Sequence, residues 1–228
     1  NLKLSKKLKN KFKEFDLIYS ANTLTHISDL KDVFISIDKV LSEKGILIIE
    51  DPSLLECVKK NSYDQFYNEH IYLFSAISVN NLIKKFNIKI FDIKNLKTHG
   101  GSLRYYIKRV DNKKIKISKK INLQIKKELK YGLDQFATYQ KFSRNVMLSK
   151  KKLVKIIANL KKDEKTLIGY GATAKATTVL NFCNLDIEMI DFFVDTTPEK
   201  FNKFMPGKKI KIYKYHKRLL DKSDYIFL

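Results

Sequence analysis

The chain has 228 residues, of which 44% are hydrophobic, 46 are lysine or arginine and 24 are aspartate or glutamate. A hydrophobic content at this level excludes an intrinsically disordered chain, and the length suits one large domain or two small ones. No apolar run approaches the roughly 20 residues needed to span a bilayer, so the sequence predicts no membrane-spanning helix and no membrane partner.

The cysteines and the first residues bear on the compartment. Cys57 and Cys183 lie far apart and form no metal-binding spacing, so we interpret both as reduced thiols. Residues 1–14 form a lysine-rich amphipathic run that lacks the apolar centre of a signal peptide. We therefore expect a cytoplasmic protein with no metal site in this chain.

The formal net charge of +22 suggests a nucleic-acid partner, because phosphates attract basic chains. Arginine is the preferred residue for bidentate contacts to phosphate and guanine, yet only four basic residues are arginine. The many lysines are spread along the chain among isoleucines and asparagines, a pattern typical of genomes rich in A and T. We expect no nucleic-acid partner and keep a basic nucleic-acid-binding α/β protein as an alternative.

The first third of the chain predicts a strand–helix–strand unit. Residues 15–20 read as a short apolar strand, and helical spacing follows over residues 30–41. Ser28 is the expected helix cap and Gly45 the expected stop. Residues 46–49 predict a second strand, buried on both faces because it has no polar alternation.

The middle of the chain predicts a sheet edge and then a long helical region. Residues 78–86 read as a short helix. Residues 88–93 and 103–109 predict an antiparallel hairpin at the edge of an otherwise parallel sheet. Residues 119–162 keep helical spacing, as one bent helix or as two helices separated near Gly132.

A second α/β unit follows. Residues 166–169 and 190–194 predict strands, with a helix over residues 173–182 between them. Residues 224–228 read as a buried strand. Since a domain rarely stops inside a core strand, and since the chain begins at Asn1, we expect a fragment of a longer protein.

Polar residues follow two strands of the first sheet. Asn22 and His26 come after the first strand, and ligands of open α/β sheets bind at the carboxyl ends of strands. Tyr67, Glu69 and His70 follow the next strand, and histidine is the usual general base near neutral pH. A turn asparagine, a surface histidine and a loop that satisfies its own backbone are the alternative interpretations.

Two glycine-containing segments have open readings as well. The glycines in residues 98–102 allow close approach of a ligand, or they simply complete a hairpin loop. Gly169 and Gly171 resemble the start of a dinucleotide fingerprint, but Ala174 stands at the third glycine position. A nicotinamide-dependent oxidoreductase is therefore a weak alternative. Lys175, near the start of the following helix, is a phosphate contact or a solvated lysine.

Four runs occur in this order: residues 21–26, 63–75, 98–104 and 169–175. Together they resemble the S-adenosylmethionine-dependent sugar C-methyltransferases that make branched deoxysugars, and the residues around Asp195 and residues 206–207 fit as well. The resemblance covers nearly the whole chain. It implies an α/β fold in which the C-terminal part of a Rossmann-like class I methyltransferase sheet precedes a second Rossmann-like domain.

The resemblance also implies a domain plan. Residues 1–115 would be the C-terminal portion of the methyltransferase domain, residues 116–164 a helical linker, and residues 165–228 a truncated Rossmann-like domain. The family's N-terminal zinc-binding domain and the front of its methyltransferase domain would be missing. Most of the S-adenosylmethionine site would be missing with them. This chain by itself is therefore expected to be inactive and to bind the cofactor poorly.

The reaction implied by the resemblance is methylation of carbon 3 in a thymidine-diphosphate 4-keto-sugar. His70 matches the family's proposed base and Glu69 would orient it, while Tyr67 and His26 would steady the enolate or the substrate. The residues expected to bind substrate are Asn22, His99, Gly100, Gly101, Ser102, Arg104, Tyr170 and Lys175. A homologue that only binds nucleotide-sugar, or that methylates another small molecule, is the alternative within this fold.

Overall fold

The structure, a computed structural model, describes residues 2–228 apart from the side chains of residues 2 and 4. It divides into two compact units. The first holds residues 1–62 and 68–140, and the second holds residues 63–67 and 141–228. Each unit has its own sheet and its own hydrophobic core.

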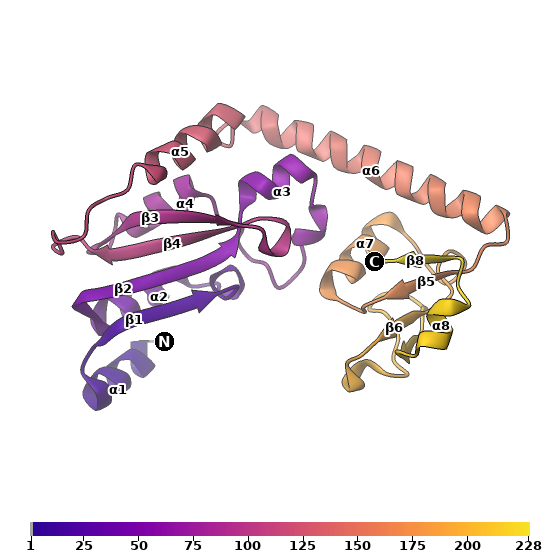
Figure 1. Ribbon diagram of the computed structural model, residues 1–228, viewed down its shortest axis with the longest axis horizontal. Helices are drawn as coiled ribbons and strands as arrows, with labels where there is room; N and C mark the ends of the chain where they lie inside the picture. Colours follow the sequence, from indigo (N-terminus) through magenta and orange to yellow (C-terminus); the bar gives the residue numbers. More distant parts are fainter. Residues whose placement is uncertain (1) are drawn as a thin grey trace. The chain divides into compact units, whose positions relative to one another are not determined.

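The first unit is built on a four-stranded sheet in the order β1-β2-β4-β3. Its strands are β1 (Phe15–Ala21), β2 (Leu41–Pro52), β3 (Ile88–Leu96) and β4 (Ser102–Arg109). The β1 and β2 arrows of Figure 1 point the same way, and β4 runs antiparallel to both of its neighbours. The expected α/β fold with an antiparallel hairpin at one edge is therefore confirmed.

Helices pack on this sheet because their apolar residues recur at helical spacing. The unit contains α1 (Leu2–Phe12), α2 (Leu30–Val40), α3 (Leu54–Lys60), α4 (Ala76–Ile83), α5 (Lys120–Tyr131) and the start of α6 (Phe136–Lys162). Phe34 of α2 and Val79 and Ile83 of α4 are buried together with apolar residues of β2, β3 and β4. Over the described residues, no helix combines the length and apolar character that crossing a membrane requires.

A buried carboxylate fixes the start of α4. Glu128 of α5 is fully buried, and it accepts hydrogen bonds from the amides of Ala76 (2.9 Å) and Ile77 (3.0 Å) and from the side chain of Gln124 (2.9 Å). A carboxylate is stabilising at a helix N-terminus, where amides lack partners within the helix. Glu128 therefore joins α5 to the segment that leads into α4.

Three local expectations need correction or refinement. Asp29, not Ser28, caps α2, since the Asp29 side chain accepts a bond from the amide of Asp32 (2.9 Å). Gly45 does not stop that helix, which ends at Val40. It lies inside β2, where an added Cβ would come within 2.8 Å of the Phe15 carbonyl oxygen. The long helical region is two helices, because Gly132 adopts a left-handed conformation (φ 86°) at the end of α5.

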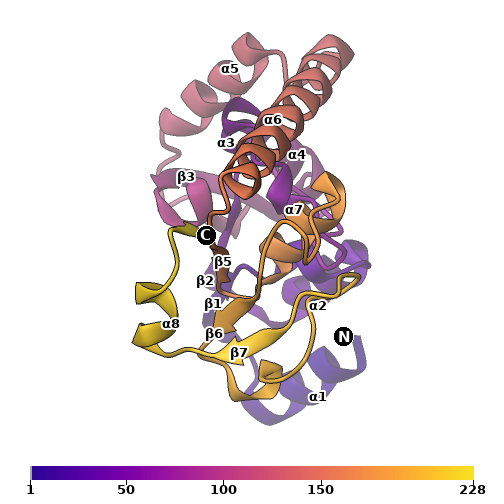
Figure 2. The ribbon, with the colours of Figure 1, turned by 90° about the vertical axis from the view of Figure 1, so that its right-hand side faces the viewer.

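The second unit contains a parallel sheet in the order β7-β6-β5-β8. Its strands are β5 (Leu167–Tyr170), β6 (Phe193–Asp195), β7 (Ile212–Lys214) and β8 (Tyr225–Phe227), and its helices include α7 (Ala174–Cys183), α8 (Lys217–Asp221) and most of α6. In Figure 2 this unit is turned toward the viewer, and β5, β6 and β7 lie next to one another. Leu180 and Cys183 of α7 and Phe193 of β6 are buried in its core.

Residues 224–228 form the expected strand, but the expectation that the strand is buried was wrong. β8 pairs with β5 alone and lies at the edge of the sheet. Tyr225 and Ile226 are 46% and 44% exposed. An apolar run without alternation therefore does not separate an edge strand from a central one.

A short segment from early in the chain completes the second unit. The Tyr63 ring packs on that of Phe182, with centroids 5.0 Å apart, and its hydroxyl lies 3.5 Å from the Cys183 sulfur. Asp64 forms an ion pair with Lys175 (3.6 Å). Residues 63–67 thus belong to the core of a unit whose other residues begin at 141.

Candidate functional site

The carboxyl ends of β1 and β2 lie at one edge of the first sheet, together with the last residue of β3 and the first residue of β4. The pairings of Ser102 with Pro52 and with Leu96 fix this arrangement. We call this edge the rim of the first unit, made of residues 22–26, 50–53, 70–72 and 98–104. It is the edge at which open α/β sheets bind ligands.

A tight turn carries His26 at the rim. Asn22 ends β1 in the left-handed conformation (φ 51°), which asparagine tolerates, and its amide donates to the Glu50 carbonyl oxygen (2.7 Å). The 3-10 helix η1 (Leu24–His26) follows, with Leu24 and Thr25 buried and His26 exposed. Leu24 and Thr25 therefore fix the turn to the interior, and the His26 imidazole faces solvent.

The chain returns to this turn at His70. The Thr25 carbonyl oxygen accepts bonds from the amides of Ile71 (2.8 Å) and Tyr72 (3.3 Å), and the Tyr72 hydroxyl donates to the Ser28 carbonyl oxygen (2.9 Å). These bonds bring the rings of His26 and His70 together, with centroids 5.0 Å apart and planes at 63°. Two imidazoles from segments 44 residues apart thus meet at the rim.

The neighbours of His70 in sequence have different surroundings. Glu69 is exposed, whereas His70 is half-buried. Tyr67 is half-buried and is counted with the second unit, while Glu69 and His70 belong to the first. The described contacts thus place His26 against His70 and assign Tyr67 to the other compact unit.

Arg104, an expected substrate-binding residue, is held by a carboxylate. Its Nε and Nη2 atoms both donate to Oε2 of Glu50 (2.9 and 2.7 Å), and the Tyr19 hydroxyl donates to the same oxygen (3.4 Å). Glu50 is buried, and Arg104 is opposite it in the pairing of β2 with β4. The ion pair fixes the guanidinium direction at the rim.

The two glycines of the β3–β4 loop have different surroundings. Gly101 has φ 131°, and a Cβ there would come within 2.7 Å of the Glu56 side chain, so its approach to α3 demands glycine. Gly100 (φ 80°) would meet nothing within 4 Å. His99 is exposed, and the Ser102 hydroxyl donates to the Thr98 carbonyl oxygen (3.1 Å). Only Gly100 of this pair faces open space.

The sequence reading missed a buried aspartate at the rim. Asp51 is 1% exposed, and burial raises the pKa of its carboxyl to about 7, although hydrogen bonding with Thr25 opposes the rise. Within residues 2–228, neither carboxyl oxygen of Asp51 completes a well-formed hydrogen bond, and neither does the Thr25 hydroxyl. The available signal was two acidic residues, Glu50 and Asp51, closing an apolar strand.

In the second unit, Tyr170 and Lys175 line a pocket of about 320 Å³ after β5. Tyr170 is 39% exposed, and its ring meets the edge of Tyr215 at 5.7 Å. Lys175 is paired with Asp64, which lines the same pocket. The pocket therefore offers aromatic surface and a cation whose charge is already partly neutralised.

The turn that resembles a dinucleotide fingerprint already holds an anion. Asp195, at the end of β6, accepts bonds from the amides of Ala172 (2.7 Å) and Thr197 (2.8 Å) and from Lys200 (3.1 Å). Burial opposes the shift, but these bonds lower its pKa to about 2. Gly169 is required by packing, since a Cβ there would come within 2.3 Å of the Phe193 ring. These features argue against a dinucleotide phosphate at this turn.

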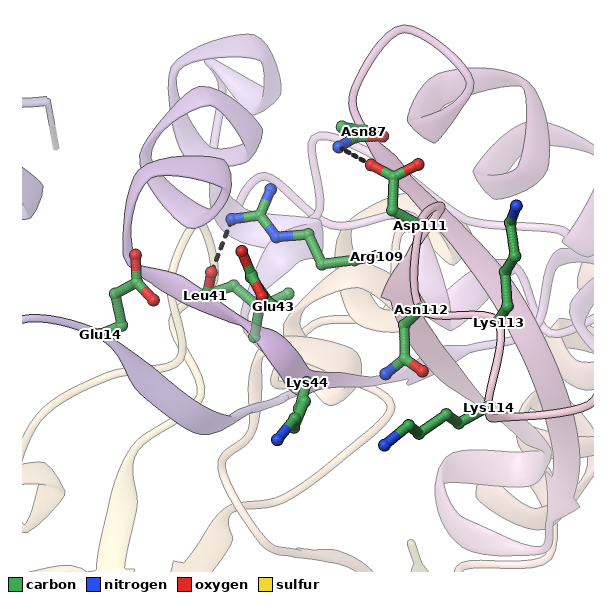
Figure 3. Close-up of a pocket in the computed structure, with 10 residues that line it drawn as sticks. All are labelled: Glu14, Leu41, Glu43, Lys44, Asn87, Arg109, Asp111, Asn112, Lys113 and Lys114. Atoms are coloured by element: carbon green, nitrogen blue, oxygen red, sulfur yellow. Dashed lines mark hydrogen bonds between the residues drawn. The ribbon is translucent and has the colours of Figure 1, made fainter.

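A larger pocket of about 550 Å³ lies at the opposite end of the first sheet (Figure 3). Two of its charged groups have local partners: Arg109 donates to the Leu41 carbonyl oxygen (2.6 Å), and the Asn87 side chain donates to Asp111 (3.1 Å). Lysines and carboxylates are mixed along its walls. Its position at the amino ends of β1 and β2 is not where such sheets bind ligands, so we place the candidate site at the rim.

Within the described residues, the rim has no glycine-rich turn after β1 or β2 of the kind that holds a nucleotide cofactor. The left-handed glycines beside it, Gly100 and Gly101, belong to the β3–β4 loop, and Glu50 is committed to Arg104. Across the residues that the structure describes, no cluster of three histidine, cysteine or acidic side chains is suited to a metal ion.

Comparison with known proteins gives the family of the chain. Residues 3–92 match a methyltransferase domain, and residues 97–228 match the family described as C-methyltransferase C-terminal domain. C-methyltransferase NovU from Streptomyces niveus is 26% identical over 214 residues, which cover 93% of this chain and 50% of the relative. The chain thus spans half the length of the curated relative that it matches. Since the second match covers more than half of the chain, the chain belongs to the C-methyltransferase family.

Proposed function

We propose that this chain carries the proton-abstraction half of an S-adenosylmethionine-dependent C-methylation. The proposed substrate is a nucleotide-linked 4-keto-deoxysugar, methylated at carbon 3. Membership of the C-methyltransferase family supports C-methylation, and the name of the NovU relative is consistent with it. In this proposal residues 1–115 belong to the methyltransferase domain, residues 116–164 link it onward, and residues 165–228 form a Rossmann-like domain.

The observation that carries the proposal is the meeting of His26 and His70 at the rim, with ring centroids 5.0 Å apart. A hydrogen next to a ketone is acidic because the resulting carbanion is delocalised onto the carbonyl oxygen as an enolate. His70 accepts that proton from carbon 3 as the general base. His26, whose ring lies against that of His70, donates a hydrogen bond to the enolate oxygen or to the substrate.

Other groups of the first unit position the substrate in this proposal. Asn22 places the sugar and Glu69 orients the His70 imidazole. The Arg104 guanidinium, fixed by Glu50, presents its remaining N–H groups to an anionic or hydroxylated part of the substrate. Gly100 lets the backbone approach the ligand.

S-adenosylmethionine, when bound, supplies the methyl group that the carbanion takes up. The residues described here do the preceding work of binding, orientation and proton removal. Holding the acidic C–H bond against a fixed base is worth several kcal/mol when the atoms are near attack distance. The proton step therefore gives a test that needs no methyl donor.

The test is exchange of the carbon 3 hydrogen for deuterium. The chain is incubated in D2O with a thymidine-diphosphate 4-keto-6-deoxysugar, and loss of the carbon 3 proton signal is followed by NMR. Native protein should accelerate exchange over buffer, and His70→Ala should slow it by about a hundredfold or more, the usual scale for a lost acid–base group.

The matched control is His216→Ala, which removes the exposed histidine that caps α8 in the other unit and should leave the exchange rate unchanged. Exchange at the buffer rate by native protein, or unchanged exchange after His70→Ala, would contradict the proposed role of the rim. Addition of labelled S-adenosylmethionine to the same mixture then reports whether a methyl group is transferred.

A further inference from the structure

Buried polar groups lie in and next to the η1 turn that carries His26. Thr25 is fully buried and Asp51 is 1% exposed, and both carry oxygens without a well-formed hydrogen bond within the described part of the chain. The Tyr105 hydroxyl on the neighbouring strand β4 is also buried and also lacks a well-formed hydrogen bond within the described residues. Buried polar groups are nearly always satisfied, so these unsatisfied oxygens need an explanation.

Thr25 links these groups to both imidazoles. It precedes His26 in the η1 turn, and its carbonyl oxygen accepts the amides of Ile71 and Tyr72, which follow His70 directly. Any group that fixes Thr25 therefore fixes the backbone on which both rings stand. Asp51 is on the adjacent strand β2 and interacts with both the amide and the hydroxyl of Thr25.

We infer that Asp51 is a positioning residue for the His26–His70 pair, and that it acts in its protonated form through Thr25. A proton on the carboxyl lets Asp51 donate to the Thr25 hydroxyl oxygen, which satisfies both buried groups with one hydrogen bond. Loss of that proton leaves a buried carboxylate whose burial outweighs the donors of Thr23 and Thr25, a costly arrangement. The η1 turn, and with it the ring pair, is then held less firmly.

The charges around Asp51 favour the protonated form. Glu50, the adjacent carboxylate on β2, raises the pKa of Asp51 further after burial, while Thr25 and the Thr23 amide lower it. Tyr105 faces Asp51 from β4, and its own pKa is raised by burial and by the charges of Glu128 and Asp51. Arg104 is committed to Glu50, so its charge is largely compensated before it can assist Asp51.

The test reads the ring pair directly. The four histidines of the chain are labelled with 13C, and nuclear Overhauser contacts between the His26 and His70 ring protons are recorded across pH. Native protein should show the contact at pH 5.5 and lose intensity above about pH 7, where Asp51 ionises. Asp51→Asn, which stays neutral, should keep the contact at both pH values, whereas Asp51→Ala should lose it.

Two further variants keep the result decisive. Thr25→Val preserves shape, removes the hydroxyl and should weaken the contact even if Asp51→Ala fails to fold. Asp92→Asn changes a partly exposed aspartate on β3 of the same sheet and should behave as native protein does.

An intact contact in both Asp51→Ala and Thr25→Val would overturn the inference. So would an Asp51→Asn variant whose contact fades with pH as in native protein, because the fading would then come from the histidines themselves. The inference rests on the proposed function only in treating the two histidines as working groups. The ring contact needs no substrate, so its failure is separate from a failure of deuterium exchange.

Discussion

Each unit has a buried aspartate at or next to the end of a parallel strand, and the two are in opposite electrostatic situations. Asp195 of β6 receives two amides and a lysine, and its pKa falls to about 2. For Asp51 of β2, burial outweighs the donors of Thr25 and Thr23 and raises its pKa to about 7. A buried carboxylate whose donors outweigh its burial stays charged and supports a turn, whereas one whose burial outweighs its donors changes protonation near neutral pH beside the candidate site.

The largest expected effect is the pH dependence of the first unit. The folded pKa of Asp51 is above its ordinary value of 3.8, so the folded state binds the proton more tightly. Its contribution to stability is fully present below pH 3.8 and is lost as pH rises through about 7, by up to about 4 kcal/mol. Hydrogen exchange of β2 peptides between pH 4 and pH 8 measures this, and Asp51→Asn should flatten the profile. If hydrogen exchange of β2 in Asp51→Asn depended on pH as it does in native protein, the contrast between Asp51 and Asp195 would be wrong.

The glycines at the two strand ends should give the next largest effect. Gly101→Ala and Gly169→Ala each place a Cβ against a side chain, at 2.7 Å from Glu56 and 2.3 Å from the Phe193 ring. We expect each to destabilise its unit by about 1–3 kcal/mol in urea unfolding, since overpacking costs energy at both positions and the positive φ of Gly101 adds strain there. Gly100→Ala, which has open space, is the control and should cost less than Gly101→Ala.

The stability contributed by Asp195 should depend on pH in the opposite direction to that of Asp51. Its folded pKa is about 2 against an ordinary 3.8, so its contribution is present above pH 3.8 and is lost as pH falls toward 2. Solvent access lowers the expected loss to about 1–2 kcal/mol. Hydrogen exchange of β6 peptides at acid pH measures it. If Asp195→Asn loses protection of β6 at acid pH as native protein does, Asp195 is not the cause of that loss.

The smallest effects concern the helix caps, where the two units should behave alike. Asp29 caps α2 in the first unit and Thr173 caps α7 in the second, each through its side chain. Asp29→Ala and Thr173→Ala should each cost about 1 kcal/mol in unfolding measurements. Ser28→Ala should be close to neutral, and a larger loss there than at Asp29 would restore the cap expected from the sequence.

Much of the fold could be predicted because apolar spacing is a local signal. The βαβ unit, the edge hairpin and the second parallel sheet all follow from runs of apolar residues separated by polar turns. Gly45 and the exposed β8 strand were misjudged, because pairing partners decide whether a glycine ends an element and whether a strand is central. Those partners lie far away in the chain and leave no mark on the local pattern.

The candidate site was only partly predictable for the same reason. The segments that carry His26 and His70 were found from their motifs, but what brings the rings together is a pair of backbone bonds to the Thr25 carbonyl oxygen. Backbone bonds of this kind have no residue signature. Asp51 was missed because a carboxylate is expected on the surface, and its burial by the sheet and the η1 turn is visible only in three dimensions.

The insertion of residues 63–67 into the second unit bears on how this protein can be dissected. A recombinant fragment starting at residue 141 would lack Tyr63, which covers Phe182 and contacts the Cys183 thiol, and would lack Asp64, the ion-pair partner of Lys175. Such a truncation would expose an aromatic ring and a sulfhydryl group that the intact polypeptide shields. Cloning boundaries chosen by sequence continuity would therefore remove part of the packing of the second unit, and a fragment of that unit should include residues 63–67.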